Sequence, residues 1–343
     1  MTKIKRDILD LSYEELAAYL KSIGEPPFRA SQVFEWIYQR GVQRFNDMSN
    51  LSSGLRARMN DNFDLLEPAV LQKDVSSDGT MKVLFELHDR EKVETVLIPT
   101  ATRVTLCVST QAGCKFGCRF CASGIGGFKR NLSCAEILSQ ILYMKRAACD
   151  RRLSHIVFMG VGEPLDNYDN LMKAIRNINS PKGINIAARR ITVSTCGLVP
   201  KIKKLAQESL QIELAVSLHG ASDASRGILM PVNKKYPVDD LIDSCRQYNK
   251  STKRQITFEY ILIKDVTCTD KAAKEISRLL KGLLCKINLI PYNPVSEFDH
   301  EPPSRNKIFA FKNQLERVGV HATIRTPRGK DVSAACGQLR HTV

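Results

Sequence analysis

The sequence has 343 residues, and its 51 Lys and Arg against 36 Asp and Glu give a formal net charge of +15. This length suits two domains, or one large α/β domain with an appendage, and 43% hydrophobic residues exclude a wholly disordered chain. Eleven cysteines are too few for a disulfide scaffold, no apolar run is long enough to span a membrane, and the first residues lack the apolar core of a signal peptide. We therefore expect a cytoplasmic protein in which clustered cysteines indicate metal or redox chemistry.

The positive charge is concentrated in the second part of the chain. Residues 1–100 carry 13 basic and 16 acidic residues, a net of −3, whereas residues 101–343 carry 38 and 20, a net of +18. Such an excess favours a polyanionic partner, usually nucleic acid, although a merely well-solvated surface is the alternative. The basic pairs are scattered, which suits a broad footprint on folded RNA.

The first hundred residues predict a small helical module followed by strands. Helical spacing covers residues 13–22 and 27–39, and Asn50 or Ser52 is a suitable cap for a third helix that runs to residue 60. Residues 68–100 alternate like strands, with a turn at Ser77-Asp78-Gly79. We expect a helical domain over 1–65, a β-hairpin extension over 66–101 and a large domain over 102–343.

The large domain repeats a strand-then-helix pattern. The predicted strands are 104–110, 155–161, 189–195, 211–218, 255–263, 285–291 and 321–326, and the predicted helices are 133–148, 168–178, 199–208, 237–248, 270–281 and 305–318. Six repeats with nearly continuous apolar strands predict a parallel sheet curled into a full or partial barrel, with a doubly wound open sheet as the main alternative. Functional residues of such barrels follow the carboxyl ends of the strands.

The segment GCKFGCRFCASG places Cys114, Cys118 and Cys121 at CxxxCxxC spacing. A structural zinc site prefers four protein ligands in two pairs, and the sequence contains no second pair. Three thiolates in one glycine-rich loop better suit a [4Fe–4S] cluster that leaves its fourth iron open to a substrate or cofactor. Phe120, directly before the last ligand, is expected to shield the cluster from water.

The spacing, directly after the first strand of a βα barrel, resembles the radical S-adenosylmethionine (SAM) superfamily. The segments VETVLIP, TLCVSTQAGCKFGCRFCASG, GFKRNL, VFMGVGEPLDNYDN, AVSLHGA, CKINLIPYNP and DVSAACGQLR together resemble the RlmN/Cfr family of RNA methyltransferases, from about residue 25 onward. The resemblance implies a partial (β/α)6 TIM-like barrel, one [4Fe–4S] cluster, two SAM molecules per turnover and an N-terminal domain that helps to recognise RNA.

The closer resemblance, to the RlmN type, implies methylation at C2 of an adenosine in the peptidyl-transferase region of 23S rRNA, and of the adenosine beside the anticodon in some tRNAs. The Cfr type, which acts at adenine C8, is the alternative within the class. A non-enzymatic Fe–S or zinc RNA-binding protein is the alternative from a different class. A reducing donor such as flavodoxin and a monomeric state are further expectations.

The resemblance also assigns roles to single residues. It implies that Cys336 carries the methyl group as S-methylcysteine, that Cys107 resolves the RNA adduct through a transient disulfide with Cys336, and that Glu94 accepts the C2 proton. Taken alone, Cys107 is equally a buried strand thiol and Glu94 an exposed strand carboxylate. The SAM contacts implied by the resemblance are Gly162, Glu163, Ser194, Ser217, Leu218, His219 and Asn293. The other six cysteines, Cys134, Cys149, Cys196, Cys245, Cys268 and Cys285, have no motif.

Overall fold

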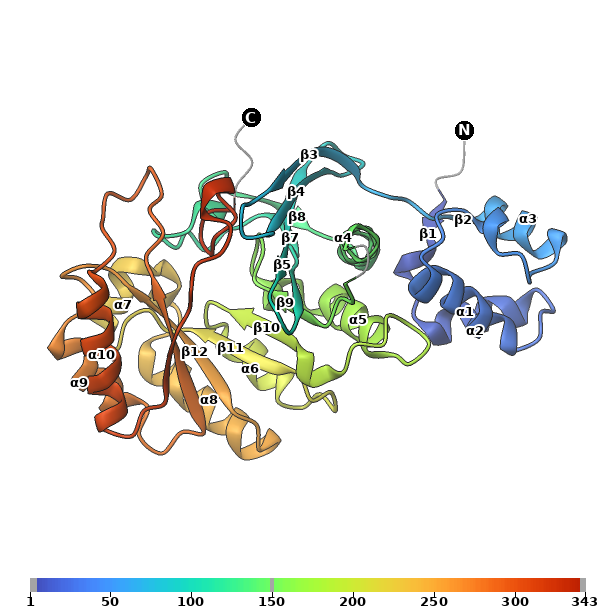
Figure 1. Cartoon of the computed structure of the whole chain (residues 1–343). Coiled ribbons are helices and arrows are strands. Elements are labelled where there is room, and N and C mark those ends of the chain that lie inside the picture. The colour runs from blue at the N-terminus through green and yellow to red at the C-terminus, as the bar shows by residue number, and fades with distance from the viewer. Residues whose placement is uncertain (1–4, 149–150, 340–343) are drawn as a thin grey trace.

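A ten-stranded mixed sheet forms the centre of the computed structural model, which describes residues 5–148 and 151–339 (Figure 1). From one edge to the other, the strands are β3 (Ala69–Val75), β4 (Met81–Glu86), β5 (Lys92–Pro99), β6 (Val104–Cys107), β9 (His155–Phe158), β10 (Ile191–Thr195), β11 (Glu213–Ser217), β12 (Ile256–Leu262), β13 (Cys285–Pro291) and β14 (Ala322–Ile324). Strands β3 to β6 pair antiparallel, and β6 and β9 to β14 pair parallel. The predicted α/β class with a parallel-rich sheet is confirmed. The strand order never reverses, so the doubly wound alternative is excluded.

Helices follow the parallel strands and pack against the outer side of the sheet (Figure 1). They are α4 (Cys134–Ala147), α5 (Tyr168–Asn179), α6 (Val199–Leu205), α8 (Val238–Thr252), α9 (Asp270–Leu279) and α10 (Arg305–Arg317). Each lies within a few residues of its predicted range. Helix α4 begins at a capping box, because Ser133 accepts from the Glu136 N–H while the Glu136 carboxylate accepts from the Ser133 N–H.

The sheet is curved, and its concave face lines a polar cavity. Inward side chains from seven parallel strands reach this cavity: Thr105, Val157, Thr192, Ala215, Thr257, Asn288 and Thr323. The turn between β3 and β4 bridges toward the opposite edge, since the Gly329 N–H donates to Asp78 Oδ2 at 3.2 Å and the Ser77 N–H donates to Asp331 Oδ2 at 3.1 Å. These two hydrogen bonds hold the segment after β14 beside the β-hairpin extension, as the red ribbon in Figure 1 shows.

The N-terminal helices α1 (Tyr13–Ser22), α2 (Phe28–Phe34) and α3 (Ser53–Asn62) lie at one end of the molecule, beside α4 and α5 (Figure 1). The Ala135 N–H at the start of α4 donates to Asp10 Oδ1 at 2.8 Å, and Asn177 on α5 donates to the Leu11 carbonyl at 3.1 Å. One continuous apolar core joins these helices to the sheet. Ser52, rather than Asn50, caps α3.

The structure differs from the predicted helix over 27–39 at one point. Helix α2 ends at Phe34, and residues 35–40 continue as a wider π-helical turn that stops at Gly41, whose φ is +71°. A glycine adopts this left-handed backbone without a Cβ clash. Among the described residues, no helix is both long and apolar enough to cross a membrane.

Candidate active site

The cysteine loop is held between two short strands. Strands β7 (Gln111–Gly113) and β8 (Phe128–Asn131) pair antiparallel and bring the loop ends together, so that the Cys114 N–H donates to the Gly127 carbonyl at 3.0 Å. Gly113 has a φ of +73°, and a Cβ there would lie 1.9 Å from the Gly127 oxygen. Glycine is therefore required where the loop closes. The sequence predicted one strand over 104–110 and missed this hairpin.

The three loop cysteines line one cavity, which contains about 1010 Å³ of empty space, its open mouth included. Burial raises the pKa of the Cys114 thiol to about 12 and that of Cys118 well above the usual value, because a charged thiolate is poorly solvated there. Binding to iron displaces the thiol proton and removes this penalty. Three thiols around one cavity thus fit an iron–sulfur cluster. Across the described ranges, no three His, Cys, Asp or Glu side chains converge on a site for a single metal ion.

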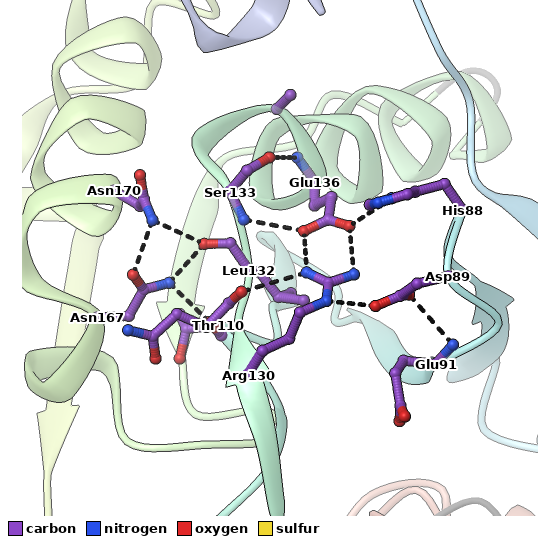
Figure 2. A network of polar contacts seen from close by, with 12 residues as sticks. His88, Asp89, Glu91, Thr110, Arg130, Leu132, Ser133, Glu136, Asn167 and Asn170 are labelled. Atoms are coloured by element: carbon purple, nitrogen blue, oxygen red, sulfur yellow. Dashed lines mark hydrogen bonds and ion pairs between the residues drawn. The ribbon is translucent and has the colours of Figure 1, made fainter. Parts of the chain in front are cut away.

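A polar network anchors the C-terminal arm of this loop (Figure 2). Arg130 on β8 forms ion pairs with Asp89, in the turn before β5, and with Glu136, at the start of α4. Directly after β8, the Leu132 carbonyl accepts from the side-chain amides of Asn167 and Asn170, at 2.7 and 3.0 Å. The loop arm is therefore attached to the hairpin extension and to helices α4 and α5.

Gly162 and Glu163 follow β9 at the rim of the same cavity. Gly162 has a φ of +102°, and a Cβ on it would lie 2.5 Å from the Gln111 Cβ. The Glu163 carboxylate is buried and accepts from two backbone N–H groups, those of Leu165 at 3.1 Å and Cys196 at 2.6 Å. Burial raises its pKa, an effect that these hydrogen bonds oppose. A ligand ammonium group would complete the stabilisation of this carboxylate.

Four further predicted residues line this cavity from the strand ends: Ser194, Ser217, His219 and Asn293. Burial, with the charge of Arg226, lowers the His219 pKa to about 3, so the ring is neutral. Its Nδ1 accepts from the Ile261 N–H at 3.0 Å, which leaves the proton on Nε2. Asn293 donates to the Cys336 carbonyl at 3.1 Å, while its Oδ1 is buried without a partner and remains able to accept from a ligand. The Leu218 side chain is fully buried and does not line the cavity.

Cys336 lies where the two cavities meet, since its residue lines both. Two hydrogen bonds fix its segment to the cysteine loop: Ala122 N–H to the Gly337 carbonyl at 2.7 Å, and Ser123 Oγ to the Leu339 carbonyl at 2.9 Å. The Cys336 side chain is exposed to the cavities. The surrounding protein nevertheless desolvates the Cys336 thiol and raises its pKa, and the positive charge of Arg325 opposes this rise.

Cys107 is buried at the end of β6, in an apolar cluster that includes Ala334 and Leu339 from the Cys336 segment. Burial and the nearby Cys336 charge raise its pKa to about 12, and Arg325 opposes this rise. The fold thus brings together two thiols that are 229 residues apart in the sequence. Both are free thiols in this structure.

Glu94 differs from the exposed carboxylate that the strand pattern alone suggested. It is buried on β5, and it shares a face of that strand with Val96, the cross-strand partner of Cys107. Its Oε1 lies 3.3 Å from Lys82 Nζ on β4, and its Oε2 has no hydrogen-bond partner. Burial raises the pKa to about 7, although Lys82 lowers it.

The sequence interpretation missed two charged residues that line both cavities, Glu259 and Arg325. Glu259 accepts from Asn288 at 3.0 Å, and Arg325 donates weakly to the Met159 sulfur at 3.8 Å. Each is a single charged residue within an otherwise apolar predicted strand, and this pattern could have marked both residues as candidate site residues. Cys196, left without a role, lines the first cavity, whereas Cys149 lies outside the described residues.

The geometry and two family models define the class. Residues 108–275 match the radical SAM superfamily, and residues 6–65 match the N-terminal domain of ribosomal RNA large subunit methyltransferases. The crystal structure of a radical SAM methyltransferase from Sphaerobacter thermophilus is 43% identical, superposes with a TM-score of 0.94, and matches over 98% of this chain and 99% of that one. The protein is therefore a radical SAM methyltransferase.

Comparison with curated relatives narrows the class further. Probable dual-specificity RNA methyltransferases RlmN from Bacillus cytotoxicus and Bacillus mycoides are 46% and 47% identical over 98% of this chain and 93% of their own lengths. The chain belongs to the RlmN family of RNA methyltransferases, which confirms the resemblance inferred from the motifs. Membership implies a [4Fe–4S] cluster, SAM and an RNA substrate.

Proposed function

We propose that this protein methylates C2 of an adenosine in the peptidyl-transferase region of 23S rRNA, and of the adenosine beside the anticodon in some tRNAs, through an S-methylcysteine at Cys336. The position of Cys336 carries the proposal. This thiol is open to both cavities, and its segment is hydrogen-bonded to the cysteine loop and packs against Cys107. A thiol that accepts a methyl group from one ligand and delivers it to another needs access to both.

In this proposal the first cavity holds the cofactors. Cys114, Cys118 and Cys121 bind the [4Fe–4S] cluster, and Gly162 and Glu163 bind the methionine end of SAM. When bound, the cluster and SAM together supply the radical chemistry that removes hydrogen from the S-methyl group. Residues Ser194, Ser217, Leu218, His219 and Asn293 orient the rest of SAM, with Leu218 contributing through its backbone because its side chain is buried elsewhere.

Glu94 and Cys107 complete the transfer after the methyl carbon has bonded to adenine C2. The buried Glu94 carboxylate, with a pKa of about 7 and a free Oε2, is suited to accept the C2 proton at neutral pH. Once the adduct has given up one electron to the cofactor site, the Cys107 thiolate attacks the Cys336 sulfur, a disulfide forms as the sulfur–carbon bond breaks, and the released carbon takes up a proton to become the methyl group. Packing of Cys107 against the Cys336 segment supports this exchange.

The second cavity suits the acceptor nucleotide. Its lining includes four cationic residues, Arg103, Lys286, Arg325 and Arg328, and also His155, whose pKa is lowered by burial, against the two carboxylates of Glu213 and Glu259. A positive polar cavity that ends at the methyl-carrying thiol can receive an unstacked base and contact its phosphates. We further expect a flavodoxin-type electron donor, a monomeric protein and a cytoplasmic location.

Mass spectrometry of RNA nucleosides tests the proposal. A strain that lacks the gene should lose 2-methyladenosine in 23S rRNA, and complementation with the wild-type gene should restore it. Loss of 8-methyladenosine instead would establish the Cfr-type reaction. If the anaerobically reconstituted protein contained no iron and sulfide and formed no 5′-deoxyadenosine from SAM, the non-enzymatic alternative would replace both.

A further inference from the structure

Gln111 connects the two halves of the proposed cofactor site. It lies at the start of β7, three residues before Cys114, and its side chain is fully buried. Its Oε1 accepts from the Glu163 N–H at 2.8 Å. Its Nε2 donates to Asn131 Oδ1 on β8 at 2.7 Å and to Asp166 Oδ2 at 2.9 Å.

The amide orientation follows from its partners. A backbone N–H can only donate, so it must face Oε1, and an ionised carboxylate can only accept, so it must face Nε2. Glutamate at this position would keep the acceptor but lose both donors. The three hydrogen bonds therefore require a glutamine.

Backbone contacts at Thr110 and Gln111 reinforce the connection between the cysteine loop and the segment after β9. The N–H groups of Thr110 and Gln111 both donate to the Val161 carbonyl, at 3.0 and 3.2 Å. Gly162 lies directly against the Gln111 side chain, with no room for a Cβ. Asp166, which accepts from Gln111, also pairs with Lys115 beside Cys114 at 2.8 Å.

We propose that Gln111 is a positioning residue that fixes the cysteine loop relative to the Gly162–Glu163 segment, and thereby places the methionine end of SAM against the cluster. The inference rests on the proposed function. Gln111 itself does not line the first cavity. It holds the first arm of the loop, β7, to its second arm, β8, and to the segment that contacts SAM.

The chain offers a matched control in Gln140 on α4. It too is fully buried, and it hydrogen-bonds to Thr95, the Ser109 backbone and the Glu136 carbonyl. None of these partners lies in residues 111–131 or 160–167. Gln140→Leu thus removes a comparable set of buried hydrogen bonds but leaves every direct bond between residues 111–131 and 160–167 in place.

The experiment compares wild type, Gln111→Leu and Gln140→Leu after anaerobic reconstitution. For Gln111→Leu, the Kd for SAM, measured by equilibrium dialysis, should rise roughly 10- to 100-fold, as is usual when a supporting hydrogen-bond partner is lost. The change that SAM causes in the electron paramagnetic resonance spectrum of the reduced cluster should also diminish. RNA affinity should stay at the wild-type value, and Gln140→Leu should bind SAM like wild type.

A second readout needs no cofactor. In the metal-free protein, amide hydrogen exchange over residues 111–131 and 160–167 should be faster in Gln111→Leu than in Gln140→Leu. If Gln111→Leu does not fold, Gln111→Glu, which is nearly the same shape, replaces it and should weaken SAM binding in the same direction.

The outcomes separate the inference from the function on which it rests. Wild-type protein that takes up no cluster and binds no SAM would contradict the proposed function itself. Wild-type protein that binds SAM, together with a folded Gln111 variant of unchanged SAM affinity and spectrum, would overturn only the positioning role. Equal losses of SAM affinity in the Gln111 and Gln140 variants would also overturn it, because they would indicate general destabilisation.

Discussion

Lys82 Nζ lies 3.3 Å from Glu94 Oε1 on the neighbouring strand, while Oε2 of the same carboxyl is buried without a partner. The pKa of Glu94 is raised to about 7, so the carboxyl is protonated, and inactive as a base, once the pH falls below that value. We expect the single-turnover rate of methyl transfer to fall on the acid side with a midpoint near pH 7. Lys82→Met removes the charge that lowers the pKa, and should move this midpoint upward.

The pH profile of Glu94→Gln provides the control. This variant should lose most of the rate and the acid-side midpoint together, because it removes the titrating group. A midpoint near pH 7 that survived in Glu94→Gln would belong to another residue. An identical profile in wild type and Lys82→Met would contradict the electrostatic coupling between the two side chains.

The packing of Cys107 against the Cys336 segment predicts different results for the two thiols. Cys336→Ala should abolish methyl transfer and form no adduct, because the carbon carrier is gone. Cys107→Ala should accumulate a covalent RNA–protein adduct, visible as a nuclease-sensitive band of higher mass in denaturing gels. Cys245→Ala, which removes a fully buried thiol outside both cavities, should behave like wild type. Normal turnover by Cys107→Ala would refute the disulfide step.

The proposed role of the loop cysteines predicts that substituting any one of them removes the iron–sulfur cluster. Replacement of Cys114, Cys118 or Cys121 by Ser should remove most iron and sulfide from the reconstituted protein, together with the visible absorption of the cluster. Cys268→Ser, at a half-buried cysteine outside both cavities, should keep the full iron content. Full iron content in all three loop variants would exclude these residues as ligands.

The contacts of Asp78, in the β3–β4 turn, predict that a substitution there impairs methyl loading of Cys336. Hydrogen bonds from Thr80 and from the Gly329 N–H lower its pKa to about 2, so the carboxylate is ionised throughout the physiological range and its contacts weaken only toward pH 2. Asp78→Ala should release the segment that carries Cys336 and reduce methyl loading of this thiol roughly tenfold, at any pH between about 6 and 9. Intact-mass spectrometry of the purified protein measures the loading. Asp61→Ala, at an exposed carboxylate on α3, is the control.

The basic lining of the second cavity predicts a change in salt dependence. Arg103→Ala and Arg328→Ala should each weaken RNA binding and lower the slope of log Kd against log salt concentration by about one, the effect of one lost phosphate contact. Filter binding over a salt series measures both quantities. Lys271→Ala, at an exposed lysine on α9 outside both cavities, should leave the slope unchanged. An unchanged slope in both arginine variants would place the RNA elsewhere.

The repeating strand–helix units of the large domain were predictable because buried parallel strands leave near-continuous apolar runs between amphipathic helices. Strand β13 matches its predicted range, Cys285–Pro291, and α10 differs by one residue. The β7–β8 hairpin was not predicted, since three- and four-residue strands beside glycines give no alternation to detect. Helix α7 (Asp223–Leu229) was also missed, because its seven residues depend on the Ser222 capping box and on packing.

The cysteine spacing and the strand-end positions indicated most of the candidate site from sequence alone. Long-range contacts could not be inferred in the same way. The sequence predicted a turn at Ser77-Asp78, but nothing local indicates its partners about 250 residues later. Likewise, Glu94 is buried with Lys82 of β4 beside it, a cross-strand contact that strand alternation alone does not reveal, so the pattern suggested an exposed side chain.

The neighbour of each sheet strand in space is also its neighbour along the chain. During synthesis the sheet can therefore grow by one strand at a time, and each new strand finds its pairing edge already formed. Because Cys336 follows β14, the ribosome makes the cysteine loop and the whole sheet before it makes this thiol. This thiol and its segment are thus the last part of the lining of the first cavity to be synthesised, after the cysteine loop and the strand ends that form most of it.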